Sequence, residues 1–379
     1  MYFFVILILC VLFFFEFKFR EKYLFRMSLT FITSILFMIL LGFNSFSPDL
    51  DSYRIHYEDI DLEYIRLSVE PFVYYLMKIC KNVGLSFEGY QLLFSMITFS
   101  FFTYSIFKYS PFPVFLFLNF FFIPFFPDIT QARFFLGFTF FLFSLQFFNT
   151  QKKLFYLLLL IAIFCHFSLL IVLVFLVLRR FHFFKSQFKS NCIIISGTAL
   201  LLLIPKNILE PLLILLNPKY STYFDPNAEG LGTFMGTLAL FIPFFILNNI
   251  ILWHYHNKYS ESTIPEKYSK NIPLFIELVQ FFNYIILFQY FIRDFSRITQ
   301  NGLIIASIYV SMVMYALIEE NKKPVAVILA VVFVCSTVII YYIQFLMVNK
   351  FQYFEVINQT FTSNYLFDYI VNFFDFRER

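Results

Sequence analysis

Long apolar runs recur along this chain and set the main limit on how it can fold. A helix needs about 20 apolar residues to cross a bilayer, and unpaired backbone groups are too costly in hydrocarbon for irregular structure. The 379 residues are 60% hydrophobic and only 14% charged, too little charge for a water-facing surface. The candidate spans are residues 3–15, 27–46, 87–107, 111–126, 134–148, 154–178, 192–204, 231–253, 272–291, 303–317 and 325–348. The sequence therefore predicts an all-α polytopic membrane protein in which residues 1–379 form a single integral membrane domain.

The run 154–178 is long enough for one tilted helix or for two half-length helices that turn at His166. Basic residues concentrate in cytoplasmic loops, so their distribution favours one of the two arrangements. With a turn at His166, more than half of the 28 Lys and Arg residues lie on one side, whereas a single span would place Arg179 and Lys189 outside. We therefore prefer the turn, which predicts about twelve transmembrane or half-length helices with both termini outside.

Two long segments are expected on the outer side, residues 47–86 and 205–230. The first is rich in charged residues and then contains an amphipathic stretch, 72–83, typical of a helix that lies along the membrane interface. The second contains several prolines and is expected to be irregular. The tail, 349–379, is polar and aromatic.

One arginine lies between two Phe-rich runs, at Arg133 in the segment 127–133. The segment leaves no room for a solvated loop, so Arg133 is expected at or just below the outer interface. Ionisable groups at membrane depth are costly and by default mark a functional site. Arg133 and the nearby Gln131 are therefore substrate-binding candidates. The alternative is an arginine at a helix start that only extends its charge to the interface.

A second pair of arginines, Arg293 and Arg297, lies at an outer helix junction. Four residues apart, they share one face if the stretch is helical, and two guanidinium groups on one face suit a diphosphate. The alternative is a pair that anchors phospholipid headgroups, with Asp294 as a partner.

Further polar candidates are Asp51, Tyr53 and Arg54, which follow the second span, and His166 at the proposed turn. A solvated acidic loop is the alternative for the first three, and a hydrogen-bonded core histidine is the alternative for His166. The sequence has none of the usual zinc, Walker or GxGxxG motifs, and it indicates no metal, no cofactor and no nucleic-acid partner.

In this order, these residues resemble the EpsG and Wzy families of bacterial polysaccharide polymerases, multi-span enzymes of the inner membrane. The resemblance covers most of the chain, and it rests on short motifs whose order, spacing and membrane sides agree. The motifs are Asp51-Ser52-Tyr53 with Tyr57, Glu70-Pro71-Phe72 before Leu76, Gln131-Ala132-Arg133, Phe164-Cys165-His166-Phe167-Ser168 and Phe295-Ser296-Arg297.

The resemblance implies a GT-C-like fold and glycosyl transfer between undecaprenyl diphosphate-linked oligosaccharides on the periplasmic face. The implied partners are a lipid-linked donor and acceptor, the lipid bilayer and a chain-length regulator. Arg133, Arg293 and Arg297 fit this chemistry, because a guanidinium binds phosphate oxygens bidentately and keeps its proton as negative charge develops.

An acceptor hydroxyl also needs a group that takes its proton, for which Asp51, Glu70 and His166 are candidates. Tyr53 is expected to contact sugar, and Arg54 is a further substrate-binding candidate. Two other functions stay open. An O-antigen ligase would share the helices, the arginines and the lipid diphosphate donor, whereas a transporter or flippase would line a pathway with interior charges.

Overall fold

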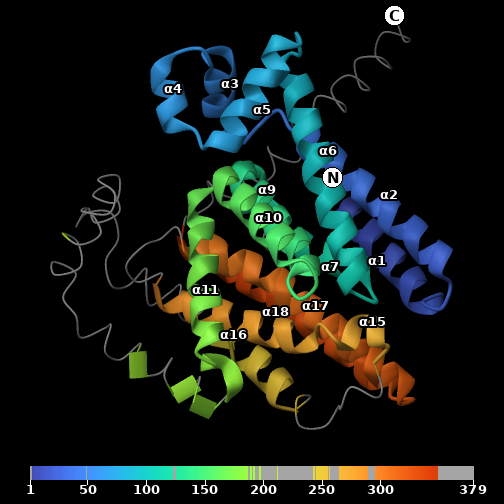
Figure 1. Ribbon diagram of the computed structural model, residues 1–379. Coiled ribbons are helices and arrows are strands. Elements are labelled where there is room, and N and C mark those ends of the chain that lie inside the picture. The colour runs from blue at the N-terminus through green and yellow to red at the C-terminus, as the bar shows by residue number, and fades with distance from the viewer. Residues whose placement is uncertain are drawn as a thin grey trace, which may run out of the picture. The chain divides into compact units, whose positions relative to one another are not determined.

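A computed structural model of the protein describes residues 2–47, 49–122, 125–186, 264–288 and 295–348, with short stretches at 188–189, 191–192, 196–197, 211, 242–243, 245–254 and 256. Within these ranges the chain is helical and contains no strand, which confirms the all-α polytopic membrane fold (Figure 1). Three described stretches are long and apolar enough to cross a membrane, namely Tyr23–Gly42, Phe87–Tyr109 and Ile298–Glu319. Shorter apolar helices accompany them, and the number of crossings stays a prediction.

The described chain divides into two compact units. The first contains the residues up to Phe121 together with Phe125–Ile171, and the second contains Phe122 and the described residues from Val172 onward. The expectation of one integral membrane domain stays a prediction. The helices of the first unit are α1 (Tyr2–Lys18), α2 (Tyr23–Gly42), α3 (Leu50–Glu58), α4 (Glu63–Ser68), α5 (Pro71–Asn82), α6 (Phe87–Tyr109), α7 (Pro113–Phe122), α8 (Phe125–Thr130), α9 (Ala132–Ser144) and α10 (Lys152–Cys165). Those of the second unit are α11 (Ile171–Arg180), α15 (Glu266–Ser269), α16 (Ile272–Phe288), α17 (Phe295–Glu319) and α18 (Lys323–Val348).

Aromatic rings fill the core of the first unit. α2 packs along α6, and α6 packs against α9 (Figure 1). Phe37, Phe102, Phe120 and Phe135 are fully buried, and the ring centroids of Phe120 and Phe135 lie 4.9 Å apart. Between apolar helices in lipid, such ring contacts hold the bundle together through close packing, because lipid tails are as apolar as the side chains.

α9 and α10 approach closely because α9 carries Gly137 at their contact. A Cβ atom at position 137 would lie 2.7 Å from the carbonyl oxygen of Ala162 and 2.6 Å from Cδ1 of Leu169. Small residues at such contacts allow helix backbones to come together. The same Ala162 carbonyl accepts the backbone N–H of His166 at 3.2 Å, so this close approach is coupled to the end of α10.

The run 154–178 is broken at His166, as the sequence predicts. α10 ends at Cys165, His166 has an extended backbone with φ −160° and ψ 118°, and a 3-10 turn follows over Phe167–Leu170 before α11. Because α10 and α11 belong to different units, the direction of the chain beyond the break stays a prediction.

The predicted span 111–126 contains two described helices, α7 from Pro113 to Phe122 and α8 from Phe125 onward. Residues 123 and 124 between them lie outside the described residues, so the expectation of one span over 111–126 stays a prediction.

Within the segment 47–86, the structure describes three helices, α3, α4 and α5, which lie together on one side of the first unit (Figure 1). α5 begins and ends within one residue of the predicted amphipathic stretch 72–83. Apart from Pro211, the segment 205–230 lies outside the described residues, as does the tail 349–379.

A carboxylate on α1 binds the start of α7. Glu16 is fully buried, and its side chain accepts the backbone N–H groups of Val114 at 3.0 Å and Phe115 at 3.3 Å. The first amides of a helix have no partner within the helix, and its N-terminus carries partial positive charge. Glu16 therefore supplies α7 with hydrogen-bond acceptors for its first amides.

In the second unit, α16 packs along α17, and α17 packs along α18. Gly302 of α17 allows the first contact, because a Cβ atom there would lie 2.7 Å from Cβ of Phe282. Arg179 of α11 forms an ion pair with Glu277 of α16, which gives the carboxylate of this apolar helix a partner.

Candidate functional site

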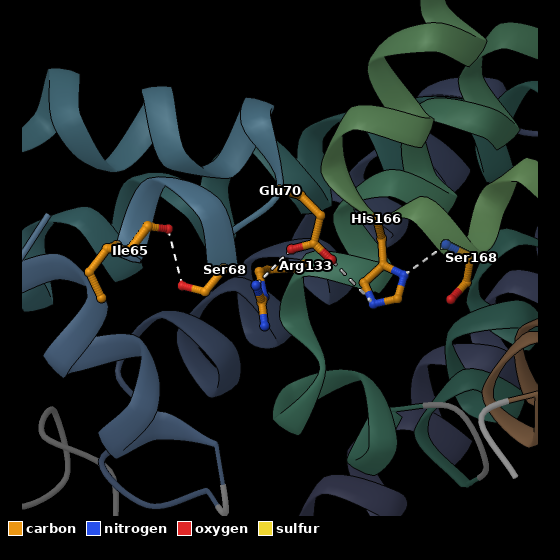
Figure 2. Close-up of polar contacts among 6 residues, drawn as sticks. All are labelled: Ile65, Ser68, Glu70, Arg133, His166 and Ser168. Carbon is orange, nitrogen blue, oxygen red and sulfur yellow. Dashed lines mark hydrogen bonds and ion pairs between the residues drawn. The ribbon is translucent and has the colours of Figure 1, made fainter. Parts of the chain in front are cut away.

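Four segments of the first unit bring polar side chains to one place beside α3 and α5. Tyr53 comes from α3, Glu70 from the residue before α5, Arg133 from the first turn of α9, and His166 from the residue after α10. Figure 2 shows Glu70 between Arg133 and His166. All three side chains are mostly buried, with exposed fractions of 13%, 22% and 18% for Glu70, Arg133 and His166.

Glu70 owes its position to the proline that follows it. A residue before proline is driven out of the helical region, and Glu70 has φ −59° and ψ 142°, so α5 begins at Pro71. The Glu70 side chain makes no capping hydrogen bond to its own helix. It reaches instead to α9, where Oε2 accepts a hydrogen bond from Nη1 of Arg133 at 2.6 Å.

Arg133 follows a break in the backbone at Gln131, where φ is −111° and ψ is 46° between α8 and α9. Its guanidinium carbon lies 5.2 Å from the ring centroid of Tyr53, a cation–π distance. Nε of Arg133 is buried and has no hydrogen-bond partner among the described residues. Since a guanidinium has five N–H donors in a fixed fork, Arg133 can hold Glu70 and still bind a second anion.

His166 presents an N–H to Glu70 and not a lone pair. Its Nδ1 accepts the backbone N–H of Ser168 at 3.3 Å (Figure 2), so in the neutral ring the proton lies on Nε2. Nε2 is 3.8 Å from Oε1 of Glu70, a distance too long for a direct hydrogen bond. The ring of Phe134 packs edge-on against the imidazole, with centroids 5.3 Å apart. His166 is thus held in one orientation by its backbone and by a neighbouring ring.

α3 adds two titratable groups whose pKa values are shifted by this environment. Burial raises the pKa of Tyr53, although the charge and hydrogen bond of Arg133 act against the rise, so the phenol stays neutral at physiological pH. Burial, and then the positive charge of Arg133, lowers the pKa of His56, which favours the neutral imidazole. The charges that act on Tyr53 are those of Arg133, Asp49 and Glu70.

A small pocket opens beside Arg133, and Tyr53, Gln91, Phe94, Ile129 and Ala132 are among the residues that line it. Its wall is almost entirely apolar, and its enclosed part has room for about two water-sized molecules. Gln91 of α6 is 9% exposed and donates its Nε2 to the carbonyl oxygens of Leu41 at 3.0 Å and Asn44 at 2.8 Å.

Gln91 and His56 are polar side chains of this region that the sequence analysis does not single out. The sequence does contain a signal for Gln91, because a side-chain amide within the apolar run 87–107 is costly in lipid unless it forms hydrogen bonds or serves a function. His56 gives no comparable signal, since it lies in a segment rich in polar residues.

Of the remaining candidates, some lie near this cluster and others do not. Gln131 precedes α9, and its Oε1 is buried with no partner among the described residues. Arg54 forms an ion pair with Glu88 at 3.0 Å and lies over the ring of Phe87, so it ties α3 to α6. Asp51 is exposed on α3. Arg293 and the side chain of Arg297 lie outside the described residues, although residue 297 itself belongs to the first turn of α17.

Within the described part of the chain, no group of three or more His, Cys, Asp or Glu side chains is arranged to hold a metal ion.

Comparison with known families gives one match, in which the model of the EpsG family aligns with residues 27–361. The aligned range includes Tyr53, Glu70, Gln91, Arg133 and His166. Comparisons with curated proteins and with solved structures give no match.

Proposed function

Because the chain belongs to the EpsG family, we propose that it is a membrane glycosyltransferase that polymerises oligosaccharide repeat units carried on undecaprenyl diphosphate. Family membership supports a role of the polysaccharide-polymerase type and a place in a membrane. The observation that supports the specific reaction is the buried group of Glu70, Arg133 and His166, in which Nε of the arginine has no partner among the described residues. We place this group on the periplasmic face of the bacterial inner membrane, where repeat units would arrive after transfer across the bilayer.

In the proposed reaction, a hydroxyl of the acceptor unit attacks the anomeric carbon of the donor sugar. The bond from that carbon to the diphosphate oxygen breaks, and undecaprenyl diphosphate leaves with the bonding electron pair. The leaving group gains negative charge in the transition state, and a preorganised cation beside it lowers the barrier. Arg133 is suited to this role because its guanidinium cannot lose its proton and offers phosphate oxygens a planar fork.

The proton of the attacking hydroxyl goes to Glu70 in this scheme. His166 is the weaker candidate because its Nε2 already carries a proton when the ring is neutral. Asp51 is the weaker candidate because it is exposed, away from the donors that surround Glu70. A carboxylate has about four lone-pair sites, so Glu70 can bind Arg133 and still accept a hydroxyl proton.

Arg293 and Arg297 are proposed to supply further positive charge to the lipid diphosphate. The chain-length regulator is likewise a proposed partner. Neither proposal is needed for the role of Arg133 and Glu70.

Complementation of a polymerase-deficient strain tests the proposal. Arg133→Ala should abolish long glycan chains, whereas Arg133→Lys should keep a small part of the activity, because lysine retains the charge without the fork. Glu70→Gln keeps an oxygen that Arg133 can bind but removes the proton acceptor, so the rate should fall by about 10²-fold to 10⁴-fold. Arg66→Ala and Glu63→Gln are matched controls, since both residues are exposed on α4.

Two outcomes would contradict the proposal. The diphosphate role is wrong if Arg133→Ala leaves glycan length and amount unchanged. The periplasmic assignment is wrong if a cysteine at exposed Ser52, in a chain without its native cysteines, is labelled only from the cytoplasm. A purified protein that ligates single units to lipid A-core without extending them is a ligase, and one that moves lipid-linked units without forming glycan is a transporter.

A further inference from the structure

The chain turns at the end of α11, and two phenylalanine side chains project from the segment around this turn. His182 has a left-handed backbone, with φ 56° and ψ 29°, and α11 ends two residues before it at Arg180. Phe181 and Phe188 are 77% and 78% exposed, the highest values among the large hydrophobic side chains that the structure describes. Because an aromatic ring in water is unfavourable, both rings call for an apolar partner.

The rings between these two phenylalanines pack in the other direction, against α16. A short 3-10 helix, η3 (Phe183–Lys185), follows the turn. Phe184 is 5% exposed, and its ring centroid lies 6.1 Å from that of Tyr284. The ring centroid of Phe183 lies 5.4 Å from the same tyrosine ring. The turn is thus held to the core of the second unit, and Phe181 projects from a packed segment.

Phe181 continues an apolar stripe on α11. Three side chains of this helix are exposed, namely Leu173, Val174 and Val177, and Phe181 lies one turn after Val177. In a membrane protein, such a stripe faces lipid tails, which are as apolar as the side chains themselves. The phenylalanine therefore marks the end of a lipid-facing surface.

Cations surround the end of this stripe. Arg180 and Lys189 are exposed, whereas Arg179 already forms an ion pair with Glu277. The sequence contains no Asp or Glu from residue 129 to residue 209, so no carboxylate close in the chain offsets the two exposed charges. Cations are costly in hydrocarbon, but they are attracted to anionic headgroups at its edge. The charge of the turn is thus complementary to an anionic lipid surface.

We propose that the segment from Arg180 to Lys189 binds anionic phospholipids in the cytoplasmic leaflet, the side on which basic residues gather. Phe181 and Phe188 enter the boundary between headgroups and acyl chains, and Arg180 and Lys189 bind the phosphate oxygens. This interaction surface belongs to the second unit, and it does not depend on the proposed transferase activity.

Phe181→Trp tests the contact in the full-length protein in nanodiscs. The one native tryptophan is removed by Trp253→Phe, so the fluorescence reports on position 181 alone. Brominated phosphatidylglycerol and brominated phosphatidylcholine quench the fluorescence on contact, and their competition gives a lipid exchange constant. At low salt this constant should favour phosphatidylglycerol by about fivefold or more, since each Lys or Arg near an anionic surface contributes about that factor. The preference should fall as salt is added.

Matched variants separate the charges from the rings. Arg180→Gln with Lys189→Gln should bring the exchange constant close to one while quenching persists, because the rings stay in the membrane. Lys152→Gln with Lys153→Gln removes two exposed charges from the start of α10 and should keep the preference. Leu160→Trp, at an exposed position of α10, should be quenched equally by the two lipids.

Three results would overturn the inference. Water-like emission from Phe181→Trp without quenching would mean that the turn faces solvent. Stronger quenching by bromines at the acyl-chain ends than by bromines near the headgroup, with an exchange constant of one, would mean that the ring lies in the hydrocarbon interior. A preference for phosphatidylglycerol that survives Arg180→Gln with Lys189→Gln would mean that these cations do not bind the headgroup.

Discussion

Gly137→Ala should weaken both the fold of the first unit and its activity, although the residue touches no proposed substrate. The added Cβ would lie 2.7 Å from the carbonyl oxygen of Ala162, and real Cβ atoms essentially never come this close to a backbone atom. Backbone cannot rotate away as a side-chain end can, so α9 and α10 must separate. Overpacking of this kind typically costs about 1–3 kcal/mol.

Separation of α9 and α10 also displaces the site residues, because the carbonyl of Ala162 accepts the backbone N–H of His166 and because Arg133 lies one turn before Gly137 on α9. A change that moves α10 away from α9 moves His166 away from Glu70 and Arg133. Displacement of catalytic groups by about 1 Å can lower a rate by about 10²-fold, so the loss of glycan should exceed the loss of folded protein.

Thermal unfolding in detergent and glycan length in complementation measure the two effects. Gly89→Ala is the matched control, because a Cβ at position 89 meets its nearest atom at 3.5 Å, an ordinary contact. That variant should be as stable as the wild type or more so, since alanine favours a helix over glycine by about 0.5–1 kcal/mol. Wild-type stability and glycan length for Gly137→Ala would refute the argument that close α9–α10 packing sets the site.

Three further predictions concern other contacts of the first unit. Glu16→Leu leaves the amides of Val114 and Phe115 buried without acceptors and should cost about 1–3 kcal/mol in the free energy of unfolding, whereas exposed Glu21→Leu should cost little. Because the pKa of His56 is lowered in the folded state, the unfolded chain binds a proton first as the pH falls through the usual histidine range, and the free energy of unfolding should decrease there. His56→Gln should reduce this decrease when unfolding is measured from pH 7 to pH 5. A double-mutant cycle of Arg54→Ala and Glu88→Ala should give a coupling of about 0.2–1 kcal/mol with glycan length unchanged, and loss of long glycan in Arg54→Ala alone would restore its predicted substrate role.

Helix positions could be predicted from the sequence wherever an apolar run ends at a polar or breaking residue. The run 87–107 becomes α6, and the break at His166 follows from a charge distribution that a single long span would disturb. Pro71 fixes the start of α5 through its own backbone geometry. In the run 111–126, the structure describes α7 and α8 on either side of residues 123 and 124, and a single span there stays a prediction.

The candidate site could be predicted only as a set of separate residues. Glu70 lies 63 residues before Arg133 in the chain, and their contact depends on the packing of α5 against α10 and on the ring contact between Phe72 of α5 and Phe140 of α9. Neither the hydrophobic periodicity nor the charge pattern of the sequence predicts that packing. Gln91 was missed because the sequence does not show the orientation of its amide, which is imposed by the backbone carbonyls of Leu41 in α2 and of Asn44 after that helix.

The bond from Glu16 to α7 also bears on how the chain is assembled in the membrane. α1 is synthesised about 100 residues ahead of α7, and proteins generally fold from the N-terminus as synthesis proceeds. The acceptor for the first amides of α7 is thus already in place when that helix enters the bilayer. Since α1 lies before the range matched by the family, a chain shortened to residues 27–361 would lose a partner that α7 needs during insertion.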